Sequence, residues 1–232
     1  MVDIQSWMGE LKGRLLEQFG GRLRALGLQG SYGRGEGGED SDIDVVAVLD
    51  HAELCDLDAY RAIVAKMPEG EKACGFLCGE WELKSWPRFD LLSLVQDTRA
   101  VHGSLVLDTR IVYGTMDGLL PPMGRAELAE GAAIGASGLY HAAVHTYLYA
   151  SREEWPEFLS AAGKSAFFVL RTLHELRCGQ RVQTRQELLD VLTGDERAVL
   201  APEEGGTPEA AFTRLLRWSA AAMAEAQDRR KV

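Results

Sequence analysis

The sequence predicts an α+β protein with two domains, a β-sheet flanked by helices over residues 1–118 and an antiparallel helical bundle over residues 119–232. Three observations lead to this prediction. Short apolar strand patterns alternate with helical patterns in the first half. The pair Pro121–Pro122 interrupts both helix and sheet. After it, apolar residues recur at helical spacing to the end of the chain. The boundary is therefore expected at about residue 119.

The first domain is expected to begin with a helix over residues 4–19, whose apolar residues share one stripe and whose N-cap is Asp3. The patterns that follow predict a strand over 22–29, a glycine-rich loop over 27–38, a buried strand over 43–49, a helix over about 52–66, and strands over 73–79, 89–95 and 110–114. A hairpin turn is expected beside Glu80 and Glu82.

The second domain is expected to hold four helices, over residues 125–150, 157–177, 184–192 and 207–228. Thr184 and Glu187 have the spacing of a capping box, and Thr207 precedes a proline suited to the first helical position. Because the links between these helices are short, neighbouring helices should run antiparallel.

Composition narrows the classes of function. Of the 232 residues, 46% are apolar and 26% charged, as in ordinary globular proteins, and the net charge is −10. This acidity argues against long nucleic acid as a substrate. The N-terminal residues lack the pattern of a signal peptide, and no apolar run is long enough to span a bilayer. We therefore expect a cytoplasmic protein, with no membrane partner, that can form a homodimer.

A glycine-rich turn, Gly30-Ser31-Tyr32-Gly33-Arg34-Gly35, follows the first predicted strand. Successive backbone N–H groups in a tight turn form an anion site, and Gly30 and Gly33 let the backbone approach a phosphate. Ser31 adds a hydroxyl donor and Arg34 a guanidinium. By itself the pattern is weak, because most glycine-rich turns only redirect the chain.

Two carboxylates, Asp42 and Asp44, open the next predicted strand. Residues i and i+2 of a strand point to the same face, so both should project beside the glycine turn. Such a pair repels unless a cation lies between the carboxylates, and Mg²⁺ favours oxygen ligands. Asp90, flanked by Phe89 and Leu91, is the preferred third acid. Glu80 and Glu82 are weaker alternatives.

Together these segments resemble the nucleotidyltransferase superfamily that includes DNA polymerase β and kanamycin nucleotidyltransferase. The resemblance covers residues 22–114 and consists of Leu28-Gln29-Gly30-Ser31, Ser41-Asp42-Ile43-Asp44 and Phe89-Asp90-Leu91. Gln29 departs from it, because that position is usually apolar. The resemblance implies a DNA polymerase β-like fold with a mixed sheet, and a C-terminal helical domain.

The resemblance also implies a mechanism with two Mg²⁺ ions held by Asp42, Asp44 and Asp90, in which Asp90 would bind the second ion or assist deprotonation of the acceptor hydroxyl. Gly30, Ser31, Arg34 and Ser41 would contact the nucleotide, with ATP or another nucleoside triphosphate as donor. An acceptor oxygen would attack the α-phosphorus and pyrophosphate would leave. Lys164, in the helical half, is the analogue of a lysine that reaches the phosphates in kanamycin nucleotidyltransferase, although it equally fits a surface lysine.

Three functions remain open at this point. The first is transfer of a nucleoside monophosphate, AMP in the favoured case, to a hydroxyl of an unknown small molecule. The second is the same chemistry on a protein, as in antitoxin-type adenylyltransferases. The third is a non-catalytic nucleotide-binding module. The sequence names neither the acceptor, the preferred base nor the general base.

Overall fold

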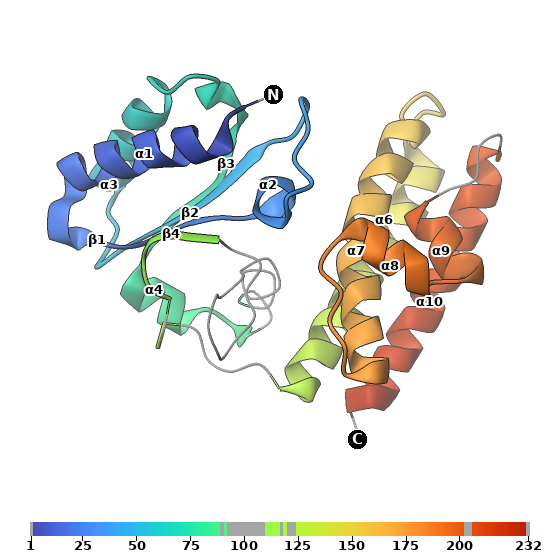
Figure 1. The fold of residues 1–232 in the computed structure, drawn as a ribbon. Helices are drawn as coiled ribbons and strands as arrows, with labels where there is room; N and C mark the ends of the chain where they lie inside the picture. Colours follow the sequence, from blue (N-terminus) through green and yellow to red (C-terminus); the bar gives the residue numbers. More distant parts are fainter. Residues whose placement is uncertain are drawn as a thin grey trace. The chain divides into compact units, whose positions relative to one another are not determined.

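The structure is a computed structural model that describes residues 2–88, 91, 110–116, 118–119, 124–201 and 206–230. The chain divides into two compact units, Met1–Pro122 and Met123–Val232. The first unit holds a mixed β-sheet with helices and the second is helical, which confirms the predicted α+β class (Figure 1). None of the described helices combines the length and the apolar character needed to span a lipid bilayer.

The first unit follows the predicted order of elements closely. Its bounds are α1 (Ile4–Phe19), η1 (Gly20–Arg22), β1 (Leu23–Leu28), α2 (Gly30–Arg34), β2 (Ile43–Leu49), α3 (Leu54–Val64), η2 (Gly70–Lys72), β3 (Ala73–Gly79), α4 (Glu80–Ser85) and β4 (Arg110–Gly114). Asp3 caps α1 as predicted, because its carboxylate accepts hydrogen bonds from the N–H groups of Gln5 and Ser6 at 3.2 and 3.3 Å.

The four strands form one sheet in the order β3-β2-β1-β4. β1 runs antiparallel to both β2 and β4, whereas β2 and β3 are parallel. The antiparallel pairing brings the end of β1 next to the start of β2, with Leu28 opposite Val45. As a result, the glycine turn that follows β1 lies beside the acids that open β2.

The two faces of β2 have different surroundings. Ile43, Val45, Ala47 and Leu49 belong to a core built with α1 and α3, both of which lie on the same side of the sheet in Figure 1. Because strand residues alternate between faces, Asp44, Val46 and Val48 point to the opposite side. Asp44 therefore projects away from the main apolar core.

Two local predictions for this unit are wrong. The loop predicted over 27–38 contains a helical turn, α2, whose Gly33 N–H donates to the Gln29 carbonyl at 2.9 Å. The hairpin turn expected at Glu80 is instead the start of α4, and β3 runs parallel to β2. The strand predicted over 89–95 falls outside the described residues except for Leu91, which is helical and bonds to Pro87 at 3.1 Å.

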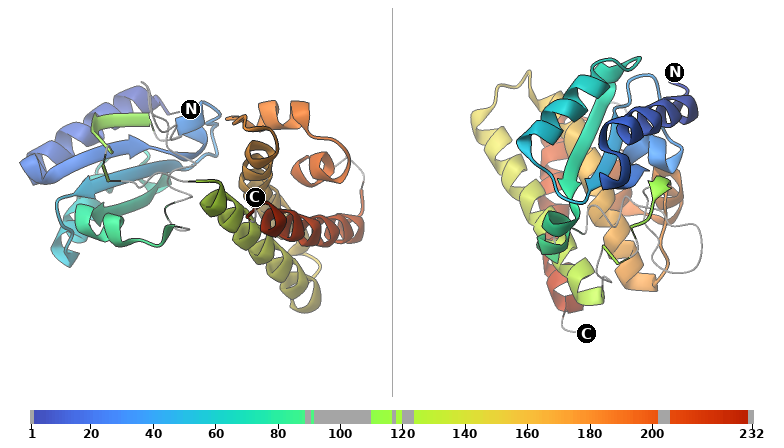
Figure 2. Two further views of the ribbon diagram at one scale, coloured as in Figure 1. Left: turned by 90° about the horizontal axis from the view of Figure 1, so that it is seen from below. Right: turned by 90° about the vertical axis from the view of Figure 1, so that its left-hand side faces the viewer.

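The second unit consists of α6 (Arg125–Tyr149), α7 (Trp155–Cys178), α8 (Arg185–Val191), α9 (Gly194–Leu200) and α10 (Pro208–Arg230). α6 runs antiparallel to α7 and α10 (Figure 1), and α6 and α10 pack side by side (Figure 2). The capping box at Thr184 and Glu187 and the cap at Thr207 are confirmed. α9 was not predicted, because its seven residues are too short to show a period.

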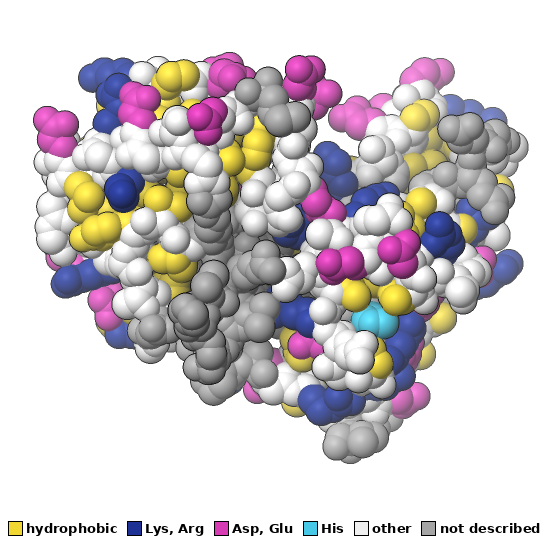
Figure 3. All heavy atoms as spheres, in the orientation of Figure 1, with side chains coloured by type: hydrophobic (Ala, Val, Ile, Leu, Met, Phe, Trp, Pro, Cys, Tyr) yellow, Lys and Arg dark blue, Asp and Glu magenta, His cyan; other side chains and the backbone are white. Residues whose placement is uncertain are grey.

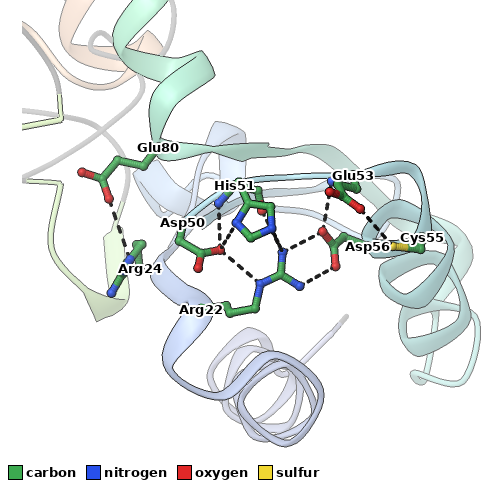
Figure 4. A network of polar contacts seen from close by, with 8 residues as sticks. All are labelled: Arg22, Arg24, Asp50, His51, Glu53, Cys55, Asp56 and Glu80. Carbon is green, nitrogen blue, oxygen red and sulfur yellow. Dashed lines mark hydrogen bonds and ion pairs between the residues drawn. The ribbon is translucent and has the colours of Figure 1, made fainter.

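A polar cluster centred on Arg22 fixes one end of the sheet to α3 (Figure 4). The Arg22 guanidinium donates to both carboxylate oxygens of Asp56 at 2.8 Å and to Asp50 at 3.1 Å. Asp56 also accepts the Glu53 N–H at 3.0 Å, so it caps α3 as well. The bonds from Arg22 hold the pKa of the buried Asp56 carboxyl below its usual value.

We expect Asp56→Asn to lower the free energy of unfolding by about 1–3 kcal/mol, because it removes charge-assisted hydrogen bonds at a buried site. Since the pKa of Asp56 is lowered in the folded state, its stabilisation should be complete above about pH 4 and lost as the pH falls through the folded-state value. Urea unfolding at several pH values measures both effects. The matched control is Asp58→Asn, an exposed acid on the same helix. An equal loss in the two variants would contradict this role for Asp56.

Candidate active site

Gly30 and Asp44 are in direct contact at the centre of the candidate site. Gly30 has a φ of 62°, and a Cβ built on it would lie 1.9 Å from Asp44 Oδ2. The adjacent Gln29 N–H donates to the Asp44 carbonyl at 2.7 Å. No residue with a side chain fits at position 30 without displacing the carboxylate or the turn. The glycine turn and the acidic strand therefore form one structural feature.

The two predicted acids stand where β2 begins. Asp42 is exposed just before the strand, and Asp44, its second residue, is half-buried. Their spacing places both on the same face of the sheet, away from α1 and α3. Next to them, the N–H groups of Gly30, Ser31 and Tyr32 open α2 and have no acceptor within that helix. The structure thus brings together Gly30, Ser31, Asp42 and Asp44.

The Asp44 carboxyl is electrostatically strained. Burial raises its pKa above the usual value, and the neighbouring Asp42 carboxylate raises it further. A hydrogen bond from the Cys74 thiol and the charge of Arg34 act in the opposite direction without reversing the shift. The site therefore favours binding of a positive charge, or of a proton, between the two acids.

The loop between α2 and β2 is closed by its own side chains. The Tyr32 hydroxyl donates to the Gly38 carbonyl at 3.0 Å, and the Ser41 hydroxyl accepts the Gly38 N–H at 2.9 Å. A Cβ on Gly37 would lie 2.4 Å from the Tyr32 ring, so the loop packs tightly over that ring. In this structure Ser41 therefore stabilises the loop, and its predicted contact with nucleotide stays a prediction.

Arg34 lies close enough to Asp44 to lower the pKa of that carboxyl. Its guanidinium also pairs with Glu36 at 2.9 Å, and only 12% of its side chain is exposed. A phosphate that binds Arg34 would have to share it with Glu36 or displace that carboxylate. Sequence reasoning missed Glu36, because an acid two residues from an arginine gives no sign of which way either side chain points.

The third acid of the predicted site, Asp90, lies outside the described residues. The alternatives Glu80 and Glu82 are excluded by their position. They begin α4 after β3 ends. Glu82 lies near Cys78, where burial and then the Glu82 charge raise the pKa of the Cys78 thiol to about 12. Cys78 pairs with Val48, which is four residues or about 13 Å along β2 from Asp44.

Lys164, the remaining predicted nucleotide ligand, is exposed on α7 in the second unit. Its predicted contact with phosphate stays a prediction.

The fit of the described residues to Mg²⁺ depends on the pair Asp42 and Asp44. Among the described residues, no group of three His, Cys, Asp or Glu side chains could by itself hold a metal ion. The pair Asp42 and Asp44 nevertheless suits a hard cation that takes its other ligands from phosphate and water, since both are carboxylates on one face and the pKa of Asp44 is raised. The residues present therefore fit a nucleotide-bound Mg²⁺.

Comparison with known proteins agrees with this geometry. Residues 8–106 match the sequence model of the nucleotidyltransferase domain. The first unit therefore carries a nucleotidyltransferase domain. The superfamily predicted from the sequence is thereby confirmed, together with its enzymatic class, the transfer of nucleoside monophosphates. No curated protein sequence matches this nucleotidyltransferase.

Among solved structures, this nucleotidyltransferase resembles spectinomycin adenyltransferase AAD(9) from Enterococcus faecialis, whose crystal structure holds ATP and spectinomycin. The TM-score is 0.57, and the match covers 96% of this chain and 99% of that one. Because the two sequences are only 11% identical, the similarity establishes the fold alone.

We expect Gly30→Ala to reduce nucleotidyl transfer by about 100-fold, the loss typical of a misplaced reactive group, because the added Cβ must displace the Asp44 carboxylate. Steady-state kinetics with the nucleotide as varied substrate measures this. The matched control is Gly20→Ala. Gly20 also has a positive φ, of 53°, but nothing lies within 4 Å of its built Cβ. Both variants should lose about 1–2 kcal/mol of stability to the left-handed backbone. Equal activity in the two would show that the contact with Asp44 is unimportant.

We also expect Asp44→Asn to raise the melting temperature of the metal-free protein at neutral pH. Folding raises the pKa of Asp44 above its unfolded-state value. The free energy of unfolding therefore falls as the pH rises from the unfolded-state pKa through the folded-state pKa, and it stays lower at every pH above the folded-state pKa. The amide removes that penalty. Calorimetry of the parent, Asp44→Asn and Asp40→Asn, which neutralises an exposed acid of the same loop, tests this. A melting temperature lower than that of the parent for Asp44→Asn, but not for Asp40→Asn, would contradict the expected stabilisation.

Proposed function

We propose that this nucleotidyltransferase transfers AMP from ATP to a hydroxyl of a small molecule and releases pyrophosphate, with Mg²⁺ as cofactor. The observation that carries the proposal is the contact between Gly30 and Asp44. It places a backbone suited to phosphate against a carboxylate suited to a cation. A Mg²⁺–triphosphate presents both of these chemical groups together.

Each residue has a distinct part in the proposal. Asp42 and Asp44 would hold Mg²⁺, which when bound supplies positive charge to the phosphates and to the leaving pyrophosphate. The N–H groups that open α2 and the Ser31 hydroxyl would donate to the outer phosphates, with Arg34 beside them. These contacts orient the chain of phosphates so that its α-phosphorus faces the acceptor.

The proposed reaction is a single displacement. The acceptor oxygen forms a bond to the α-phosphorus as the bond from that phosphorus to the bridging oxygen of pyrophosphate breaks. The acceptor proton would pass to a general base that the sequence does not identify, and Asp90 would bind the second metal ion or assist this deprotonation. Ser41 and Lys164 are further predicted contacts of the nucleotide.

A small acceptor suits the surface of the protein better than long nucleic acid. The net charge is −10. On the visible face of each unit, acidic and basic side chains are interspersed, with no continuous basic surface among the described atoms (Figure 3). A nucleic-acid backbone requires such a surface. The adenyltransferase with the similar fold binds the small molecule spectinomycin with ATP, which also supports a small acceptor.

The acceptor can be identified by incubating the protein with Mg²⁺ and α-labelled ATP in the presence of candidate hydroxyl compounds, spectinomycin among them. A labelled small product supports the proposal. A labelled protein band from a cell lysate, without any small product, would favour the antitoxin-type alternative. Absence of nucleotide binding in calorimetry would overturn both. A cytoplasmic location and a homodimer stay predictions.

We expect Asp42→Asn and Asp44→Asn each to lower kcat/KM for ATP by about 100-fold or more, because each removes a ligand that stabilises charge in the transition state. Asp40→Asn is the matched control, since Asp40 is an exposed acid two residues before Asp42. It should retain activity within about threefold, as surface substitutions do. Equal losses in all three variants would indicate a general effect of loop charge rather than two specific ligands.

A further inference from the structure

Cys74 lies next to Asp44 on the neighbouring strand. In the parallel pairing of β2 and β3, the two residues are direct partners, so their side chains share one face of the sheet. The Cys74 thiol lies within hydrogen-bonding reach of the Asp44 carboxylate, and its donor lowers the pKa of that carboxyl. Cys74 is exposed, so this thiol is at the open surface of the site and not in the apolar core.

The backbone that carries Cys74 is held closely against β2. The next residue, Gly75, has a φ of 105°, and a Cβ built on it would lie 2.0 Å from the Val45 carbonyl oxygen. Just before it, Lys72 Nζ donates to the Glu39 carbonyl at 3.0 Å, which joins the start of β3 to the loop that precedes β2. These two contacts hold the backbone on either side of Cys74 close to β2 and to the loop that precedes it.

We propose that Cys74 is a positioning residue that holds the Asp44 carboxylate in the orientation needed to bind the cation of the nucleotide. This inference rests on the proposed function, since it concerns the same cation. The Asp44 side chain is limited by the Gly30 backbone at Oδ2, and the thiol restrains its rotation from the adjacent strand.

The chemistry of a thiol suits this task. A carboxylate has several acceptor positions, so a single donor leaves the others available to a cation. A thiol is a weak donor, and it restrains the carboxylate without neutralising the charge that the cation requires. Cys74 acts through Asp44 and needs no contact of its own with nucleotide or metal.

The test compares the parent protein with Cys74→Ala, Cys74→Ser and Cys55→Ala by calorimetric titration of Mg²⁺ in the presence of ATP. Cys74→Ala should raise the apparent Kd for Mg²⁺ about three- to tenfold, the equivalent of one lost hydrogen bond of ordinary strength, because a thiol is a weak donor. Cys74→Ser retains a donor and should recover most of the affinity. Cys55, an exposed cysteine on α3, is the matched control and should leave the Kd unchanged.

The outcomes separate this inference from the proposed function. If the parent protein does not bind Mg²⁺ and ATP, the proposed function fails, and this inference fails with it. If the parent binds and Cys74→Ala binds equally well, only the role of Cys74 is overturned. If Cys74→Ala and Cys74→Ser lose affinity equally, the hydrogen bond is not the cause and the positioning role is also wrong. In kinetics, positioning predicts a higher KM for Mg²⁺ in Cys74→Ala that Cys74→Ser reverses.

Discussion

The candidate site depends on one close contact, that of the Gly30 backbone with the Asp44 carboxylate. A Cβ at position 30 would lie only 1.9 Å from Oδ2, so the turn and the strand can meet only where glycine stands. The antiparallel pairing of β1 and β2 brings these two segments together, and the bond from the Gln29 N–H to the Asp44 carbonyl fixes their register. The loop from residue 35 to 41 then has to close over a short distance, which Tyr32 and Ser41 achieve through their bonds to Gly38.

The rest of the first unit keeps that contact in place at both ends of the sheet. On one face of β2, alternate residues pack into the apolar core with α1 and α3, which leaves Asp44 on the other face. At the far end of β2, Arg22 ties Asp50 and Asp56 together, so α3 is anchored where the strand ends. The acids at this end are stabilised by a fixed arginine, whereas Asp42 and Asp44 repel each other. Asp50 and Asp56 therefore form a structural cluster, whereas Asp42 and Asp44 form a pair suited to an exchangeable cation.

Much of the fold and part of the candidate site could be predicted from the sequence. Helical spacing and caps located α1, α7 and α10, and the β-branched run located β2, because these patterns are long and their period is clear. The turn and its two acids were predicted as a site because residue type and spacing agreed across separate segments. Side-chain partners could not be found in this way. Cys74 is brought to Asp44 by the pairing of parallel strands, and Glu36 reaches Arg34 through the shape of a loop. Glu80 looked like a candidate ligand only until the direction of β3 placed it at the wrong end of the sheet.

The raised pKa of Asp44 also bears on how a substrate would enter. A carboxylate that is half-buried beside another acid is less stable when charged. A cation that binds there relieves the repulsion between the two acids, and this relief adds to its binding free energy. A triphosphate without a cation would instead meet two negative charges close to the N–H groups of α2. Under the proposed function, the site would therefore favour the triphosphate only together with its cation, because the charges that destabilise the protein would select the complex of nucleotide and metal. The tight contact at Gly30 maintains the repulsion between Asp42 and Asp44, because it keeps the Asp44 carboxylate from turning away from Asp42.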